Sequence, residues 1–227
     1  MSYLVVLLAS FLAVIIVVTT HEYAHAFVAN KCGDPTPRLY NRLSLNPLNH
    51  FDPIGILAFA IVGFGWAKPV PINPYNFKNY KWGSFWTSAA GIIINFISAF
   101  LFYPLYILVS IYVVPLVSAT YAAIFLSQFT KLLFVYSLSF CVFNLLPLYP
   151  LDGFRLLEVL SRKRRKVYQF LSSYGYQILI GLVLLSFLSE RVAILAPLNV
   201  LGYVLRFATD ILGYPITTFW KFLFKLG

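Results

Sequence analysis

The stretch LVVLLASFLAVIIVV, residues 4–18, is an almost unbroken apolar run that leads directly into THEYAHAFVAN, residues 20–30. A helix needs about 20 apolar residues to cross the hydrocarbon core of a bilayer, and a helix over residues 3–30 would be long enough to cross and protrude. No basic segment precedes the run and no small-residue cleavage site closes it, so a retained membrane helix is favoured over a signal peptide. Its polar residues then lie toward one end.

The composition of the whole chain agrees with a membrane protein. Of its 227 residues, 60% are hydrophobic and only 11% are charged. A soluble domain carries about a quarter charged residues, so this chain has too few charges to solvate a surface of its size. We therefore expect an all-α polytopic membrane protein with about five to six membrane segments, which leaves no room for a separate soluble domain.

Further spans are expected over residues 83–114, 121–149 and 170–188, with a weaker candidate over 192–212. In the tail, residues 215–227, aromatic residues alternate with lysines, which suits a helix lying in the membrane interface. The free cysteines Cys32 and Cys141 show neither a disulfide framework nor metal-binding spacing.

Residues 31–82 differ from the rest, because prolines and asparagines are concentrated there. Residues 37–47 contain short alternating stretches that suit a strand or hairpin. Residues 54–66 form an apolar run too short to cross a bilayer comfortably, which favours a re-entrant segment. We expect a small membrane-associated strand and re-entrant region after the first helix.

Basic residues mark one side of the membrane. They follow the first helix, precede the second, and form the run RKRRK at residues 162–166. The positive-inside tendency places these three clusters in the cytoplasm. The net charge of +10 is then explained by topology and by attraction to anionic lipids, so no nucleic-acid partner is expected. We predict an integral protein of a prokaryotic cell membrane.

The most informative stretch is His21, Glu22 and His25. Side chains four residues apart share one face of a helix, so the two imidazoles can converge on one metal ion. In metalloproteases of this pattern the glutamate beside them acts as general base. The alternative is a chance cluster paired for charge at a helix end. A glutamate near hydrocarbon is costly unless it has a use, which favours metal binding.

A hydrolytic zinc site needs a third protein ligand and one open position. The candidates are His50, Asp34, Asp52, Glu158 and Asp152. Asp152 is favoured because it lies in FNLLPLYPLDGFRLL, where Pro147 and Pro150 break a hydrophobic span. A broken helix at membrane depth is tolerated where it lines a cavity or packs on protein. Asp152 could instead cap the helix that begins at Gly153, and both roles can hold together.

Five ordered segments, HEYAHAFVA, RLSLNPLNHFDPIG, WAKPVPINPYNF, AGIIIN and NLLPLYPLDG, resemble those of the site-2 proteases, which are intramembrane zinc metalloproteases. The resemblance covers about residues 20–157 and is to a compact form without PDZ or CBS modules. It implies one Zn²⁺ per chain, held by His21, His25 and Asp152, with Glu22 as the catalytic residue.

The resemblance also places Asn144 near the metal. Its amide could hold the substrate backbone or the developing oxyanion, although a helix-to-helix hydrogen bond is an alternative. The chain departs from the family pattern at Ile92, where a proline is usual, and at Phe154, where a second glycine is usual. No role is assigned to Asn95. His50 is interpreted as structural or as support for the metal ligands, because a fourth protein ligand would close the water position.

The resemblance implies hydrolysis of peptide bonds within or near the transmembrane segment of single-span membrane-protein substrates, with membrane lipids as further partners. The substrate helix must unwind, and an edge strand at Ser44 and Leu45 could pair with it, unless this stretch is an ordinary hairpin. The active site is expected toward the cytoplasmic side. The competing class is a multi-pass metal-binding protein or ion transporter without proteolytic activity, although no repeated half is present.

We expect residues 1–227 to form a single integral-membrane protease domain, with a catalytic core over about residues 3–157 and C-terminal helices over 168–227. The sequence carries no signal for an oligomeric state.

Overall fold

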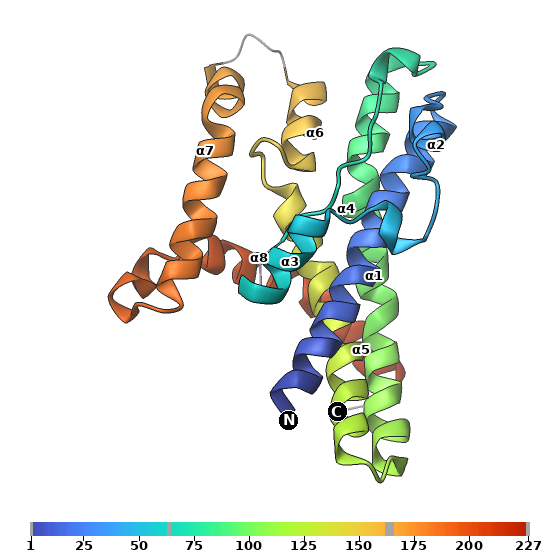
Figure 1. Ribbon diagram of the computed structural model, residues 1–227, viewed down its shortest axis with the longest axis vertical. Helices are drawn as coiled ribbons and strands as arrows, with labels where there is room; N and C mark the ends of the chain where they lie inside the picture. Colours follow the sequence, from blue (N-terminus) through green and yellow to red (C-terminus); the bar gives the residue numbers. More distant parts are fainter. Residues whose placement is uncertain (1, 63–64, 162–165, 226–227) are drawn as a thin grey trace.

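The computed structural model describes residues 2–62, 65–161 and 166–225 (Figure 1). Its regular elements in these ranges are helices, and Phe51 and Ala67 form one isolated antiparallel bridge. The α-helices are α1 (Ser2–Lys31), α2 (Thr36–Leu39), α3 (Pro53–Val62), α4 (Tyr80–Leu108), α5 (Thr120–Leu145), α6 (Asp152–Leu160), α7 (Lys166–Ser189) and α8 (Val200–Leu223). Short 3₁₀ and π segments join them. The all-α class expected from the sequence is confirmed.

Four helical stretches in the described ranges are long and apolar enough to cross a membrane: Ser2–Lys31, Tyr80–Leu116, Thr120–Leu145 and Lys166–Ser189. The sequence predicted five to six membrane segments. The difference arises at α3, which has only 10 residues, and at α8, which carries Arg206, Asp210 and Lys221. A charge within the hydrocarbon core is costly, so α8 is a poor spanning helix despite its 24 residues.

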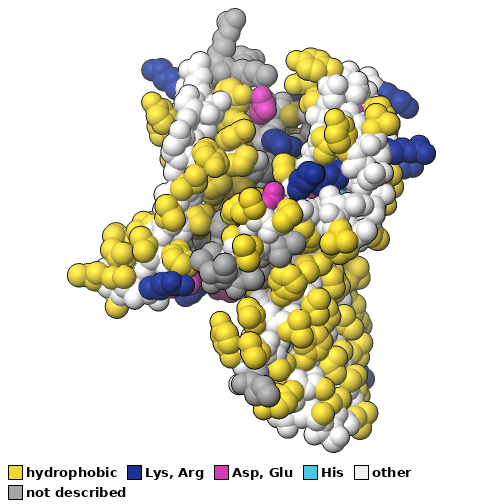
Figure 2. Space-filling model, in the orientation of Figure 1, with side chains coloured by type: hydrophobic (Ala, Val, Ile, Leu, Met, Phe, Trp, Pro, Cys, Tyr) yellow, Lys and Arg dark blue, Asp and Glu magenta, His cyan; other side chains and the backbone are white. Residues whose placement is uncertain are grey.

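Helices α1, α4 and α5 pack side by side as the central bundle (Figure 1). Small residues line their contacts, and Ala9, Ala13, Ala26, Ala29 and Ala99 are all fully buried. Membrane helices use small residues in this way because they let two backbones approach closely. Larger apolar side chains point outward and cover the lower part of the molecule (Figure 2), as expected of a surface that faces lipid.

The chain between α1 and α4 is held by buried polar residues. The carboxylate of Asp34 accepts hydrogen bonds from the backbone N–H and hydroxyl of Thr36 (3.0 and 2.6 Å), from Asn73 N–H (2.7 Å) and from Asn76 Nδ2 (2.9 Å). Burial alone would raise the pKa of Asp34, but these hydrogen bonds outweigh it and hold the pKa below its usual value. Asp34 thus ties the end of α1 to the segment that leads into α4.

The other two polar anchors are Arg42 and His50. The Arg42 guanidinium donates to the carbonyls of Lys68 (3.0 Å) and Pro69 (3.3 Å), and His50 Nε2 donates to the carbonyl of Ser44 (2.6 Å). His50 is fully buried and stands away from the other two histidines, so its predicted structural role agrees with its contacts.

The strand or hairpin expected over residues 37–47 is not found. These residues form the end of α2 and then turns, with Asn41 at a positive φ of 55°. Asn46 caps a 3₁₀ turn over Pro47–Asn49 by accepting from the N–H of Leu48 (3.1 Å). Asparagine and proline favour turns over strands, and here that local preference prevails. The apolar run expected to be re-entrant forms α3 as far as Val62; residues 63–64 lie outside the described ranges.

Helix α8 also differs from expectation. The sequence predicted a weak span over residues 192–212 and a separate interfacial helix over 215–227, but α8 continues through Pro215 as one helix. Its contacts explain the continuity, since Ile216 packs among Ala99, Tyr103 and Leu138, and the indole of Trp220 donates to the carbonyl of Phe100 (2.9 Å). Tertiary packing outweighs the local effect of the proline.

Candidate metal centre

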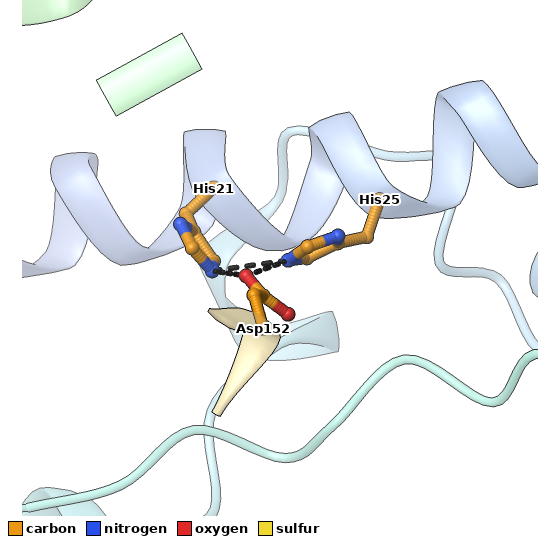
Figure 3. Close-up of side chains that lie close together, drawn as sticks. All are labelled: His21, His25 and Asp152. Carbon is orange, nitrogen blue, oxygen red and sulfur yellow. Dashed lines mark hydrogen bonds and ion pairs between the residues drawn. The ribbon is translucent and has the colours of Figure 1, made fainter. Parts of the chain in front are cut away.

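Helix α1 places His21 and His25 one turn apart on its buried face. Their Nε2 atoms lie 3.0 Å apart. Asp152 approaches from α6, and its Oδ2 lies 3.3 Å from Nε2 of His21 and 3.0 Å from Nε2 of His25 (Figure 3). The three residues are 5%, 5% and 6% exposed. Three potential ligand atoms therefore converge on one point inside the protein.

The break between α5 and α6 delivers Asp152. Helix α5 ends at Leu145, Pro147 and Pro150 keep the connection non-helical, and Asp152 begins α6. A Cβ on Gly153 would overlap the carbonyls of Leu145 and Leu146, so only glycine fits there. The N-cap residue of α6 is Leu151, and no side chain caps the backbone N–H groups of the first turn. The carboxylate of Asp152 is therefore not used as a helix cap.

The departure at Phe154 does not disturb this turn. The Phe154 ring is buried, stacks on Tyr168 with centroids 5.7 Å apart, and meets the edge of Tyr149 at 5.8 Å. Ile92 stands where the family has a proline, and α4 runs through this position as a regular helix. Both departures are therefore accommodated by ordinary packing.

Helix α4 supports the two histidines from behind. His25 Nδ1 lies 2.7 Å from the carbonyl oxygen of Thr87, and His21 Nδ1 lies 3.0 Å from the side-chain amide of Asn95. Between these residues, a Cβ on Gly91 would overlap both imidazoles. Sequence reasoning missed this support, although a threonine, a glycine and an asparagine at intervals of four in an apolar helix was an available signal.

The three converging residues fit a zinc ion. Zinc binds imidazole nitrogen and carboxylate oxygen at about 2.0–2.2 Å in a tetrahedral arrangement, which separates ligand atoms by about 3.3 Å. The observed separations are 3.0–3.3 Å. Among the described residues, Oδ2 of Asp152 receives no hydrogen bond and faces only the two imidazole nitrogens. Three protein ligands leave a fourth position open, as a hydrolytic site requires.

A hollow opens beside the cluster. It is lined by His21, Glu22, His25, Pro69, Val70, Ile72, Asn144, Pro150, Leu151, Asp152 and Arg155. Glu22 is half-buried, and Asn144 donates from Nδ2 to the carbonyl of Phe140 in its own helix (3.1 Å). The structure therefore brings Glu22 and Asn144 to the same hollow as the three candidate ligands. The alternative helix-to-helix hydrogen bond of Asn144 is not found in the described part of the chain.

The remaining candidate ligands serve elsewhere. Asp52 accepts from the N–H groups of Ile54 (2.9 Å) and Gly55 (3.1 Å) at the start of α3, and Glu158 accepts from the Tyr168 hydroxyl (3.1 Å). Asp34 and His50 are the loop anchors described above. Ser44 lines a separate surface hollow with Arg38, Asn41, Leu43 and Asn49, and Leu45 is exposed. Ser44 and Leu45 thus lie in a turn and not on a strand.

Two histidines and an aspartate converge on one point beside a glutamate, in a bundle of helices that could span a membrane. These are the residue types with which a metallopeptidase holds zinc and activates water. Comparison with known proteins agrees with this class. The sequence pattern of peptidase family M50 matches residues 107–187, a stretch that includes Asn144 and Asp152. A protein of Bacillus subtilis (strain 168) named "Putative zinc metalloprotease YwhC" is 40% identical over 178 residues, which cover 78% of this chain and 77% of that protein.

The chain therefore belongs to peptidase family M50, the site-2 protease family. The resemblance found in the sequence is confirmed, and with it the class of zinc metalloprotease with membrane helices. No solved structure matches the chain.

Proposed function

We propose that this protein is an intramembrane zinc metalloprotease that hydrolyses peptide bonds within or near the transmembrane segment of single-span membrane proteins. The observation that carries the proposal is the convergence of His21, His25 and Asp152 on one point beside Glu22. The three residues hold one Zn²⁺ per chain. All of residues 1–227 form one membrane protease domain, with the catalytic core over about 3–157 and supporting helices over 168–227.

Each side chain has a defined task. When bound, Zn²⁺ would supply a Lewis acid that polarises the peptide carbonyl and makes a water molecule more acidic. Glu22 takes a proton from the attacking water and delivers it to the leaving amine nitrogen. Asn144 turns its amide N–H from the Phe140 carbonyl toward the carbonyl oxygen of the substrate, where it stabilises the developing negative charge.

The unwound substrate needs new backbone hydrogen-bond partners. Residues 69–72 form neither helix nor turn, and Val70 and Ile72 line the metal hollow. Val70 is buried, and its backbone makes no hydrogen bond with any described residue, so its N–H and C=O could pair only with a peptide that enters the hollow. The sequence suggested Ser44 and Leu45 for this role, but the Ser44 carbonyl already accepts from His50. We therefore place substrate pairing at residues 69–72.

Photo-crosslinking tests this placement. A crosslinker introduced at Val70 should capture substrate in the Glu22→Gln variant, which binds without cleaving, whereas one at Ser44 should capture little. Stronger capture at Ser44 than at Val70 would restore the sequence-based assignment.

The metal end of α1 faces the cytoplasm in this proposal, in a prokaryotic cell membrane. Lys31, Arg38 and Arg42 follow that end of the helix, and basic side chains gather around the upper half of the molecule (Figure 2). Lys31 and Arg38 are exposed and can also contact anionic lipids. A cysteine introduced by Arg38→Cys in a Cys32→Ser background should react with a membrane-impermeant thiol reagent only from the cytoplasmic side. Substrates should then be cut in the cytoplasmic half of their span.

The decisive experiment combines cleavage with metal content. The purified protein should cleave a single-span substrate, and a zinc chelator should stop cleavage. Glu22→Gln should lower the cleavage rate by about 10²–10⁴-fold while zinc remains bound, because Glu22 acts on water and is not a ligand. A transporter or simple metal-binding protein that used Glu22 as a ligand would instead lose zinc, and that result would overturn the proposal.

A further inference from the structure

We infer that Asn95 is a positioning residue of the metal centre, which accepts a hydrogen bond from Nδ1–H of His21 through its amide oxygen and so leaves Nε2 of His21 bare for the metal. This inference rests on the proposed zinc site. It assigns a role to a residue of α4 that lies outside the converging group itself.

His25 shows how the support works. Its Nδ1 lies 2.7 Å from the carbonyl oxygen of Thr87. A backbone carbonyl can only accept, so Nδ1 of His25 carries the proton. A histidine that binds a metal is neutral and has one N–H, so with that proton on Nδ1 the nitrogen left for the metal is Nε2 of His25, which points at Asp152. The main chain of α4 thus sets the tautomer of this histidine.

The same requirement applies to His21. Its Nε2 faces Asp152 Oδ2 and Nε2 of His25, and it must also be bare to bind a metal. The proton of a neutral His21 then lies on Nδ1, which needs an acceptor. The group that faces Nδ1 is the amide of Asn95, 3.0 Å away.

The surroundings of Asn95 decide which amide atom serves. In the structure Nδ2 faces His21, while Oδ1 is buried and has no hydrogen-bond partner among the described residues. Once Nδ1 of His21 carries its proton, that arrangement would set two donors against each other. Turning the amide by half a rotation brings Oδ1 to Nδ1–H of His21. Among the described residues it breaks no other hydrogen bond, because Nδ2 contacts only His21 and Oδ1 has no partner. Oxygen and nitrogen of an amide occupy nearly the same volume, so both orientations fit.

Among the described side chains of α4, Asn95 is the one that contacts Nδ1 of His21. The side chain is 0% exposed, so bulk water cannot take its place. Thr87, Gly91 and Asn95 lie four residues apart on one face of α4, and Gly91 provides the space that both imidazole rings occupy. The tautomer of His25 is therefore set by a main-chain carbonyl, and the tautomer of His21 by a side chain that mutation can change.

The test compares zinc affinity, measured by competition with a chromophoric chelator, in full-length protein purified in detergent. Asn95→Leu and Asn95→Ala remove the acceptor and should weaken zinc binding by about 10–100-fold. Asn95→Asp keeps an acceptor oxygen but has no amide N–H, and it should bind zinc within a few-fold of the unmodified protein. The visible spectrum of the Co²⁺-loaded protein should change in the Leu and Ala variants and be retained in the Asp variant.

Two results would overturn the inference. One is an Asp variant as weak as the Leu variant, which would show that Asn95 acts as a donor or by shape alone. The other is unchanged affinity in both Leu and Ala variants. Ser137→Ala is the matched control, because it removes another fully buried polar atom without a partner and should leave zinc affinity unchanged. His25→Ala separates the two proposals: if zinc binding survives it, the zinc site itself is wrong.

Discussion

Asp34 and Asp152 lie in two buried regions of the molecule, the chain between α1 and α4 and the metal centre, and their surroundings differ. Each oxygen of Asp34 meets protein donors, four in all, which hold the loop in place. Oδ2 of Asp152 receives no hydrogen bond from the described residues and faces two nitrogens that must themselves be bare to bind a metal. Burial is common to both, so unsatisfied acceptors, and not burial, distinguish the candidate ligand from the structural anchor.

The histidines repeat the contrast. His50 is fully buried and donates to a main-chain carbonyl of its own loop, whereas His21 and His25 turn their Nε2 atoms toward each other and toward Asp152. Nδ1 of His50 is also buried without a partner among the described residues, so the histidines differ in convergence: only the ligand atoms of His21, His25 and Asp152 lie within 4.8 Å of one another.

The largest effect should come from removing the candidate carboxylate ligand. Asp152→Ala should abolish stoichiometric zinc binding and proteolysis, because only two ligands then remain. Metal content after dialysis measures the first and cleavage of a single-span substrate the second. Asp34→Ala, which removes another buried carboxylate, should keep its zinc. Loss of zinc in both variants would contradict the assignment of Asp152 as a ligand and Asp34 as a loop anchor.

A somewhat smaller effect is expected at Gly91. Gly91→Ala places a Cβ where the two imidazoles lie, so the rings must shift and zinc affinity should fall by about 10–100-fold. Gly181→Ala in α7 is the matched control, because a Cβ there meets nothing within 4 Å. It should leave zinc affinity unchanged and can raise stability by up to about 1 kcal/mol. Equal zinc affinity in the two variants would contradict the close approach of α4 to the histidines.

For the loop, the expected effect is on stability. Asp34→Ala leaves buried donors without an acceptor and should lower the free energy of unfolding by about 2–4 kcal/mol. Thermal unfolding in detergent would show this as a lower midpoint, and Asp34→Asn should fall between the Ala variant and the unmodified protein. A midpoint unchanged by Asp34→Ala would mean that this loop does not contribute to the cooperative unit.

The smallest effect is the pH dependence of the same anchor. Because folding lowers the pKa of Asp34, its contribution to stability is fully present above the ordinary carboxyl pKa of about 4 and is lost as the pH falls through the lower folded value. The difference in unfolding midpoint between the unmodified protein and Asp34→Asn should shrink as the pH is lowered below about 4. A difference that grows toward acid would reverse the sign and exclude the ionised carboxylate as the anchor.

Much of the metal centre was predictable, because each of its ligands carries a local signal. The spacing of His21 and His25 sets them on one helix face, and Asp152 stands at a proline-marked break in an apolar span. Their support was not predictable in the same way. The Thr87 contact uses a main-chain carbonyl, which no side-chain pattern reveals, and Asn95 has a clear role only once α4 is seen to lie against α1.

The errors in the fold have physical causes too. Residues 37–47 alternate as a strand would, but Asn41, Asn46 and Pro47 favour turns, and among the described residues no partner strand is present to outweigh them. At the other end, Pro215 suggested a break, but the burial of Ile216 against α4 and α5 keeps α8 continuous. Local preference decided the first case and long-range packing the second.

The separation of the candidate ligands along the chain has a consequence for local unfolding. An ion shared by α1 and the start of α6 would close a chain loop from residue 21 to residue 152, a cross-link that restrains the unfolded chain as a disulfide of that span would. Helix α6 has only nine residues and enters the bundle through the single turn that carries Asp152. Removing the ion should therefore release α6 before the long helices, so that amide hydrogen exchange on chelation rises first near residues 146–160. A bound ion would cross-link α1 to α6, and the shorter of these two helices should lose its protection first when the ion is removed.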